Sequence, residues 1–507
     1  MLLTAAIFIA RGAKWLRFLV LPFAAISILQ FGYYLYSEQE IDKFFWMAIE
    51  STERAEAVSF IAALTPLQVA TFAAYIIICA YLVFCIFRAD NCAFSLEKAV
   101  AVLVCMTVAY EVHPVQTVFG DTTVHGVIGD GYYGHVVTSL EQAHEFRISP
   151  VPMHVVESPQ GPLANQILVV IGESASRLRM GVYGYPRNTT PLIGNNALVF
   201  NNDIAVGLNT QPNVQTLLTG LLHISVQGVD QDIFRAARSA AYTSIVIDNN
   251  GFENDDPVVR LSMQATQYIS MNGVGVDSPS TADQIKHDQV VIKPFIHQIK
   301  LFGGHKTLYL IHLMGSHPVQ KLRYPNAFNK FPSYYDNSIL YTNYIISELR
   351  RILMEHAKGS AVMIYVADHG VGLPPGCGMR KIPDPEHASY GADNKYFSNY
   401  AVPLIVWTNS DFRMHNPRIV DSIRSNLNKP IDQRFLTYSV SQVMGIKSIN
   451  GTPVDSKSIF SAKSDFEPRL DVFGRNMESR FQDGEVCASR SVKKQWSSGV
   501  PVGAAKQ

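Results

Sequence analysis

The stretch ILVVIGESASRLRMGVYGYPRNTT, residues 167–190, decides the fold of this chain. An uninterrupted apolar run over residues 167–171 predicts a strand buried on both faces, as strands of a parallel sheet are when helices cover both sides. The run stops at Gly172, and Glu173 follows directly. Ligands of open α/β sheets bind beyond the carboxyl ends of the strands, so Glu173 is a candidate to hold a cation or a charged substrate. The alternative is that Glu173 only begins a helix.

Further apolar runs alternate with helical stretches along the chain. Residues 342–356 (TNYIISELRRILMEH) are one helical candidate. Strands that alternate with helices indicate an α/β fold, with a mostly parallel sheet flanked by helices on both faces. The expected strands lie within residues 166–171, 244–247, 307–313, 361–367 and 401–407.

Two apolar stretches near the N-terminus are long enough to cross a bilayer, which takes ~20 residues in a helix. Residues 15–36 contain one charge, Arg17, near their start, and residues 66–87 contain none. A third, weaker stretch covers residues 99–110. A secretory signal peptide does not fit, since no basic region precedes the first apolar run and further apolar stretches follow. We expect a transmembrane region over residues 1–112.

The Lys and Arg residues predict how these spans are oriented. The loop over residues 37–65 is acid-rich. Because basic residues favour the cytoplasmic side, this loop and everything after about residue 112 are expected outside, in the periplasm or the extracellular space. The basic residues lie before the first span and around the link between the second and the third: Arg11, Lys14, Arg17, Arg88 and Lys98.

The exported part is expected to have three sections. A linker over residues 113–160, with many Gly, His, Pro and Val, leads to a large domain over residues 161–465. An extension over residues 466–507 follows. From residue 488 this extension has polar and turn-forming residues without periodicity, which is typical of a disordered tail.

Composition excludes some function classes. The 507 residues have a formal net charge of zero and no long basic block, so nucleic-acid binding is not expected. Of the six cysteines, Cys377 and Cys487 fall in the exported part and are a candidate disulfide. No CxxC pair occurs, so a cysteine-based zinc module is not expected.

Other predicted strands also end in residues that can bind a metal ion. Asp368 and His369 follow one apolar run, and His312 and His317 lie at the end of another. Taken singly, an Asp-His pair is explained by a cap or a turn, and each histidine by a surface position or a hydrogen bond in the core. Together at one sheet edge, carboxylates and imidazoles predict zinc, because an exported site without thiolates uses such ligands. Zinc would activate a coordinated hydroxyl and neutralise phosphoryl oxygens.

Four short motifs in this order resemble the membrane-anchored phosphoethanolamine transferases of the sulfatase/alkaline phosphatase superfamily. The resemblance covers about residues 14–460 and implies a sulfatase-like α/β domain. The segment RMGVYGYPRNTTP is more similar to the branch that acts on lipopolysaccharide core or periplasmic glucans than to the lipid A branch. The motifs are Gly172-Glu173-Ser174, Met180-x-x-Tyr183-Gly184-Tyr185-Pro186-Arg187-x-Thr189-Thr190-Pro191, Gly315-Ser316-His317 and Asp368-His369-Gly370.

The resemblance also locates a nucleophile. Sulfatases carry Cys or Ser, then x-Pro and a later Leu-Leu-Thr-Gly, and residues 210–220 have Thr-Gln-Pro and Leu-Leu-Thr-Gly at that spacing. In the transferases a threonine stands three positions after a glycine, as Thr210 stands after Gly207. We therefore expect Thr210 to form a phosphorylated intermediate, with Thr216 and Thr219 as alternative candidates. Thr210 also fits a structural role as a helix cap, and both roles are compatible because a helix N-terminus stabilises phosphate.

The resemblance implies the roles of further residues. The implied ligands of one Zn²⁺ are Glu173, Thr210, Asp368 and His369. The residues implied to contact the transferred phosphoryl group or a second metal ion are His312, His317 and His387. The stretch Tyr335-Asp336-Asn337-Ser338 also matches the family and is interpreted as structural support.

The N-terminal part resembles the family less completely. The transferases usually have five spans; on this resemblance the first two are missing from residues 1–112, with residues 1–10 as the stub of the second. An extracytoplasmic loop of the family helps to hold the headgroup of the donor, and residues 48–57 (AIESTERAEA) resemble it, with Thr52 and Glu56 at its polar positions. An exposed helix face is the alternative interpretation of these two residues.

The resemblance implies transfer of phosphoethanolamine from phosphatidylethanolamine to an envelope glycan or lipopolysaccharide. The protein would be a multi-pass protein of the bacterial inner membrane, in contact with membrane lipids, with its catalytic domain in the periplasm. Two alternatives stay open. One is a glycerol-phosphate transferase or phosphodiesterase of the same superfamily, and the other is a catalytically silent, membrane-tethered envelope protein.

Overall fold

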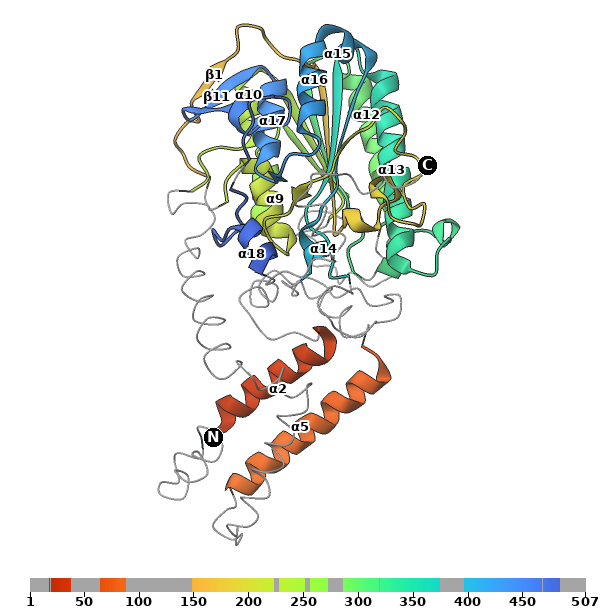
Figure 1. Ribbon diagram of the computed structural model, residues 1–507, viewed down its shortest axis with the longest axis vertical. Helices are drawn as coiled ribbons and strands as arrows, with labels where there is room; N and C mark the ends of the chain where they lie inside the picture. Colours follow the sequence, from red (N-terminus) through yellow and green to blue (C-terminus); the bar gives the residue numbers. More distant parts are fainter. Residues whose placement is uncertain are drawn as a thin grey trace. The chain divides into compact units, whose positions relative to one another are not determined.

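The computed structural model describes residues 18, 20–37, 64–87, 148–222, 228–250, 256–271, 286–318, 320–373, 396–466 and 468–483. The chain forms two compact units (Figure 1). Helices α2 (Val20–Ser37) and α5 (Pro66–Phe87) belong to one unit, and the elements from β1 onward belong to the other.

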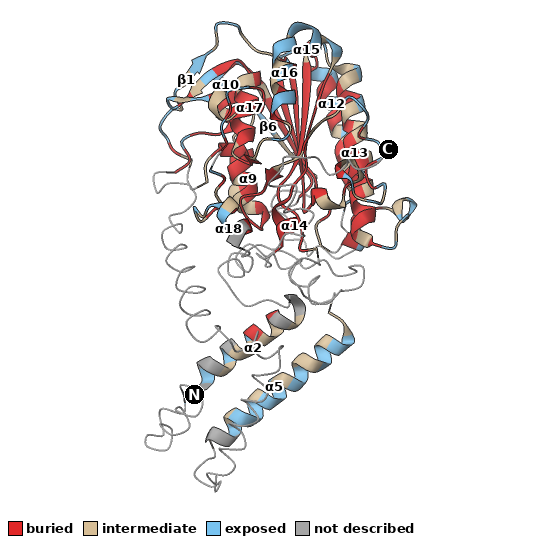
Figure 2. Cartoon of the chain, in the orientation of Figure 1, coloured by how far each residue is buried: buried red, intermediate tan, exposed pale blue. Residues whose placement is uncertain are grey.

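Helices α2 and α5 pack against each other within the first unit. The hydroxyls of Ser27 and Tyr75 lie 2.6 Å apart, and the ring of Phe31 stacks on Tyr75 with 4.0 Å between centroids. Much of α5 is exposed (Figure 2). Within the described residues, one helical window, Pro66–Phe84, is long and apolar enough to cross a membrane by length and composition.

The predicted spans correspond to these helices in part. Helix α5 has the bounds predicted for the second span, and α2 covers most of residues 15–36. The third expected span lies outside the described residues, as do Thr52 and Glu56. Membrane insertion of this unit stays a prediction.

The larger unit is built around a seven-stranded sheet with the order β3-β9-β8-β2-β7-β5-β6. The five strands from β8 to β6 run parallel, whereas β9 is antiparallel to β8 and β3 is antiparallel to β9. The predicted, mostly parallel sheet is thus confirmed, with a mixed edge that the sequence did not indicate. The strands are β2 (Gln166–Gly172), β3 (Leu198–Phe200), β5 (Thr243–Asp248), β6 (Gln267–Ser270), β7 (Thr307–His312), β8 (Ala361–Ala367) and β9 (Leu404–Thr408).

Alternating residues of β2 face opposite layers of helices. Ile167, Val169 and Ile171 join the core on one face, and Leu168 and Val170 join the core on the other. Every residue of β2 and β8 is buried, which explains their continuous apolar sequences (Figure 2). The first face packs against α9 (Thr210–Thr219), α10 (Ile233–Ser239), α15 (Ser410–His415), α16 (Pro417–Asn426) and α17 (Phe435–Val443), and the second against α12 (Ile292–Phe302) and α13 (Tyr334–His356).

The folded part is longer at both ends than the expected 161–465. Ile148 forms a β-bridge with Val229, so the end of the expected linker belongs to this unit. Beyond residue 465, the buried guanidinium of Arg469 donates to Asn202 O at 2.9 Å and pairs with Glu478 at 2.6 Å. Neither segment has the apolar periodicity from which these contacts could be predicted. The remaining elements are β1 (Val155–Glu157), β4 (Asp203–Ile204), α11 (Pro257–Ser262), α14 (Phe397–Tyr400), β10 (Ile431–Asp432), β11 (Ile446–Ile449), β12 (Thr452–Pro453) and α18 (Met477–Asp483).

Helix α13 begins at Tyr334, whereas residue 342 was the predicted start. Ser333 caps it, because its hydroxyl accepts a hydrogen bond from Asp336 N at 3.3 Å. The first two turns carry polar side chains, including Asp336 and Asn337, that are buried against the loops of the site. Such a segment lacks the apolar stripe on which the prediction depended.

Candidate metal centre

Three neighbouring strands of the sheet end at the same edge, and each provides polar residues there. Glu173 follows the central strand β2, Asp368 and His369 follow β8, and His312 ends β7. The parallel registers of β2 with β7 and of β2 with β8 place these ends side by side. Chain segments far apart in sequence therefore meet at one point, where open α/β sheets bind ligands.

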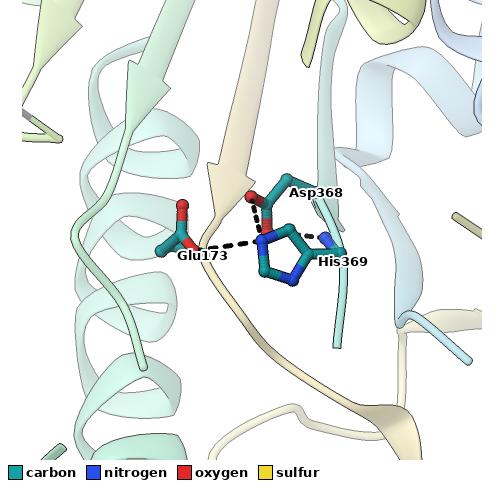
Figure 3. A group of neighbouring side chains, drawn as sticks. All are labelled: Glu173, Asp368 and His369. Atoms are coloured by element: carbon teal, nitrogen blue, oxygen red, sulfur yellow. Dashed lines mark hydrogen bonds and ion pairs between the residues drawn. The ribbon is translucent and has the colours of Figure 1, made fainter. Parts of the chain in front are cut away.

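Glu173, Asp368 and His369 form a compact buried group (Figure 3). One ligand atom from each lies within 4.8 Å of the others, and all three residues are fully buried. His369 Nε2 lies 3.5 Å from Glu173 Oε1 and 3.3 Å from Asp368 Oδ2. His369 Nδ1 is 2.7 Å from Gly370 O, so Nδ1 donates to that carbonyl and Nε2 is the ring nitrogen that faces the carboxylates.

The charges of this group favour the binding of a cation. Burial alone would raise the pKa of Glu173, but attraction to His369 and His317 and the hydrogen bond from Ser174 lower it to about 2. Burial and the nearby Glu173 carboxylate raise the pKa of Asp368 well above its usual value. Two buried carboxylates in contact repel each other unless a proton or a cation lies between them. Two carboxylates and one imidazole are a donor set that suits zinc.

Thr210 is the first residue of α9 and lies against the same carboxylate. Its Oγ1 donates a hydrogen bond to Glu173 Oε2 at 3.0 Å. The side chain of Asn213 holds the preceding loop, since its Oδ1 accepts from Val206 N (3.0 Å) and Gly207 N (2.8 Å). By contrast, the alternative Thr219 donates within the helix to Gln215 O at 2.7 Å. The structure therefore places Thr210 in contact with the acidic group and at a helix N-terminus, where anions are stabilised.

His312 and Asn250 complete the buried side of the site. Asn250 Nδ2 donates to Glu173 Oε2 at 3.0 Å and lies 3.3 Å from His312 Nε2. His312 Nδ1 lies 3.6 Å from Asp248 Oδ1, which gives the ring a carboxylate on its other side. Asp248 and His312 are register partners at the ends of β5 and β7.

A family model described as Sulfatase matches residues 165–446, more than half of the chain. The chain belongs to the sulfatase family. The residues of the metal centre and Thr210 all lie inside the matched part.

Relatives of this sulfatase-family chain carry a more specific name. The chain is 26% identical over 320 residues to phosphoethanolamine transferase EptC of Escherichia coli K12, covering 57% of this chain and 53% of that protein. It is 26% identical over 271 residues to phosphoethanolamine transferase OpgE of the same strain, covering 52% and 49%. The chain thus spans about half the length of the curated relatives it matches.

Solved structures share the sulfatase fold of this chain. The membrane protein EptA, the lipooligosaccharide phosphoethanolamine transferase of Neisseria meningitidis, superposes with a TM-score of 0.60 at 18% identity, covering 88% of this chain and 87% of that one. The C-terminal periplasmic domain of EptC from Escherichia coli, solved in complex with Zn, gives 0.54 at 22% identity, covering 65% and 95%. At these identities the likeness shows the fold alone.

The predicted residues of the sulfatase-family site are brought together in part. Glu173, Thr210, Asp368 and His369 meet as expected from the resemblance. His317 is half-buried, and its charge acts on Glu173. His387, Cys377 and Cys487 lie outside the described residues, and their roles stay predictions.

Sequence reasoning missed two residues that shape the sulfatase-family site. Asn250 lies three positions after the apolar run 244–247, just beyond the end of β5, so the end of a predicted strand was the signal that could have found it. Asp288 is buried and accepts hydrogen bonds from Met314 N (2.8 Å) and Gly315 N (2.9 Å), so it holds the loop that leads to His317. Nothing in its local sequence (KHDQVV) indicates this long-range contact.

Gly315→Ala is expected to destabilise the domain and to weaken metal binding. Gly315 has φ +50°, and a Cβ there would lie 2.7 Å from Glu173 O and 2.8 Å from Glu173 N. These backbone atoms cannot yield without moving Glu173, so we expect a loss of roughly 2–5 kcal/mol in unfolding free energy. Gly161→Ala is the control, since Gly161 also has positive φ (+70°) but nothing within 4 Å, and should cost only about 1–2 kcal/mol. Chemical denaturation measures both, and equal losses would contradict the expected crowding at Glu173.

Proposed function

We propose that the protein is a zinc-dependent phosphoethanolamine transferase with Thr210 as its nucleophile. The observation that carries this proposal is the hydrogen bond from Thr210 Oγ1 to Glu173 Oε2, at the N-terminus of α9 and beside Asp368 and His369. A hydroxyl held in this way suits nucleophilic attack on phosphorus. The names of the relatives support phosphoethanolamine as the transferred group.

We assign zinc to Glu173, Thr210, Asp368 and His369. The ion would supply a positive charge that lowers the pKa of the threonine hydroxyl and offsets charge on phosphoryl oxygens. The two oxygens of Glu173 have different neighbours: Oε1 lies near His369, whereas Oε2 accepts hydrogen bonds from Thr210 and Asn250. One carboxylate can therefore bind the metal ion through Oε1 and the nucleophile through Oε2.

The reaction proceeds in two displacements. In the first, Thr210 Oγ1 attacks the phosphorus of phosphatidylethanolamine, its proton passes by way of Glu173 Oε2, and diacylglycerol leaves with a proton. In the second, an acceptor oxygen attacks the phosphorylated Thr210, the bond from phosphorus to Oγ1 breaks, and the acceptor's proton returns to Thr210. The backbone N–H groups at the start of α9 face the developing negative charge.

Other residues are proposed to hold the phosphoryl group or a second metal ion. His312 and His317 lie at the end of β7 and in the loop after it, on the same edge of the sheet as Glu173. His387 is proposed for the same task on the resemblance alone, as are Thr52 and Glu56 for the donor's headgroup.

We place the protein in the bacterial inner membrane as a multi-pass protein, with the catalytic unit in the periplasm. The apolar window of α5 and the basic residues that flank the predicted spans support this orientation. The donor would be drawn from membrane lipid, and the acceptor would be lipopolysaccharide or a glucan of the envelope.

Mass spectrometry of envelope lipids and glycans tests the proposal. Cells that produce the protein should contain acceptor molecules heavier by one phosphoethanolamine group, and cells without it should lack them. A mass increase of one glycerol phosphate would instead identify a glycerol-phosphate transferase. No modified acceptor, with the purified protein also failing to release diacylglycerol from labelled phosphatidylethanolamine, would contradict a transferase function.

A further inference from the structure

The residue after Glu173 is held in an unusual backbone conformation. Ser174 has φ +54°, a left-handed value that a residue with a Cβ adopts only when its surroundings impose it. Its backbone N donates to Asp368 Oδ1 at 2.9 Å, and its Oγ donates to Glu173 Oε1 at 2.5 Å. Ser174 thereby links the two carboxylates of the metal centre, and the link depends on this conformation.

One side chain braces this turn from both sides. The hydroxyl of Tyr335 donates to Ser174 O at 2.7 Å and accepts from Ser176 N at 2.7 Å. Tyr335 is fully buried in the first turn of α13. Both hydrogen bonds have the length of strong neutral ones, and they use the donor and the acceptor capacity of a single phenol.

The first turn of α13 is itself fixed to the surrounding loops. Asp336 accepts from Arg187 Nη1 at 2.6 Å and from Tyr185 OH at 2.9 Å, which ties the segment after Ser174 to the helix. Ser338 Oγ donates to Ser316 Oγ at 2.9 Å, and Ser316 N donates to Glu173 O at 2.9 Å. The start of α13 is thus tied to these loops, and within the described part of the chain the Tyr335 hydroxyl bonds to the Ser174 turn.

We infer that Tyr335 is a positioning residue for the metal: its hydroxyl holds the Ser174 turn in the conformation that points Glu173 and Asp368 at one cation. Tyr335 does not touch the proposed ligand atoms, so it acts through Ser174. The inference rests on the proposed metal site. It gives the YDNS stretch a specific task beyond structural support.

Zinc affinity of the full-length, detergent-solubilised protein tests the inference, with Tyr335→Phe as the variant. Phenylalanine fills the same volume and removes only the hydroxyl. Loss of a partner that orients a metal ligand typically weakens binding 10–100-fold, so we expect the zinc dissociation constant to rise at least ~10-fold. Competition against a chromophoric chelator measures it, and thermal unfolding of the metal-free variants shows that they fold.

Tyr341→Phe is the matched control. Tyr341 lies on the same helix, is equally buried, and its hydroxyl accepts from a backbone group, Gln289 N, at 3.1 Å. Tyr335→Phe leaves two backbone groups without their partner and Tyr341→Phe leaves one, so the first should lower the unfolding temperature of the metal-free protein more, but Tyr341→Phe should bind zinc as tightly as the wild type. Wild-type affinity in Tyr335→Phe, or an equal loss of affinity in both variants, would overturn the inference.

The same preparations separate this inference from the proposed function. A wild-type protein that binds zinc and transfers no phosphoethanolamine would contradict the function, while a selective loss of affinity in Tyr335→Phe would still support the inference. A wild-type protein that transfers the group, together with a Tyr335→Phe variant of normal zinc affinity, would support the proposed function and overturn the inference. Absence of zinc binding by the wild type would overturn both.

Discussion

Thr210→Ala is expected to abolish phosphoethanolamine transfer while leaving the fold intact. The substitution removes the oxygen that donates to Glu173 Oε2 and that would carry the phosphoryl group. The helix start does not depend on this side chain, because Thr210 is the first helical residue and not the N-cap, which corrects the alternative role as a cap, and Asn213 holds the loop ahead of the helix. Loss of a covalent nucleophile typically lowers turnover by on the order of 10³-fold or more.

A radiolabelled or fluorescent phosphatidylethanolamine donor measures this effect as released diacylglycerol and as label on the protein. Thr210→Ser should retain part of the activity, since it keeps a hydroxyl at the same place. Thr219→Ala is the matched control on the same helix, because its hydroxyl bonds to Gln215 O and not to Glu173. If Thr210→Ala still transfers phosphoethanolamine, or if only Thr219→Ala loses this activity, another residue is the nucleophile.

Asp368→Asn is expected to remove zinc binding and transfer, yet to make the metal-free protein more stable. At neutral pH the folded wild type must either protonate Asp368, whose pKa is raised by burial and by Glu173, or keep a second buried negative charge. Both options cost free energy, and asparagine requires neither. Its amide oxygen can still accept from Ser174 N and His369 N, and its amide nitrogen can donate to His369 Nε2, which lies 3.3 Å from the present Oδ2.

Thermal unfolding in the presence of a chelator, with elemental analysis for zinc, tests this prediction. The unfolding temperature of metal-free Asp368→Asn should lie a few degrees above that of the metal-free wild type. Asp288→Asn should instead lower the unfolding temperature, because both oxygens of Asp288 accept hydrogen bonds from N–H groups. In asparagine, the NH₂ group would face one of these donors. Stability that falls in Asp368→Asn, or zinc that remains bound, would contradict the role assigned to this carboxylate.

The sequence predicted most of the sheet because its central strands are buried on both faces. Runs such as 167–171 and 361–367 contain only apolar residues, and each became a strand of the sheet. Strands β3 and β6 were not predicted, since they are short and, in β6 (QYIS), not apolar. The antiparallel edge formed by β9 and β3 also has no local signature, because strand direction depends on how the chain returns to the sheet.

The grouping of candidate ligands was predictable for the residues that directly follow strands. Glu173, Asp368 and His369 stand at strand ends, where strand order alone brings them together. Residues that act through other side chains left no such pattern. Tyr335, for example, reaches Ser174 across 161 positions of sequence, and this contact depends on a helix start that the sequence did not reveal.

The segment RMGVYGYPRNTTP, which carries the family resemblance, contains Arg179, Tyr185 and Arg187. The sequence did not indicate what these three side chains contact. All three converge on the buried carboxylate of Asp336. Through Asp336 they tie the loop after Ser174 to the start of α13. A motif can therefore mark a family through residues that stabilise a loop.

The order of the strands has a consequence for how the protein is made. The first strand of the sheet to be synthesised, β2, becomes its centre, and its partners β7 and β8 follow much later, so that Ser174 and Asp368 are 194 positions apart. Until both partners have emerged, β2 exposes an apolar edge on each side, and pairing so distant in sequence is slow. The nascent chain therefore needs protection from aggregation over this interval. The proposed ligands Glu173 and Asp368 meet only after most of the domain has been synthesised, so zinc at this site would bind late in folding.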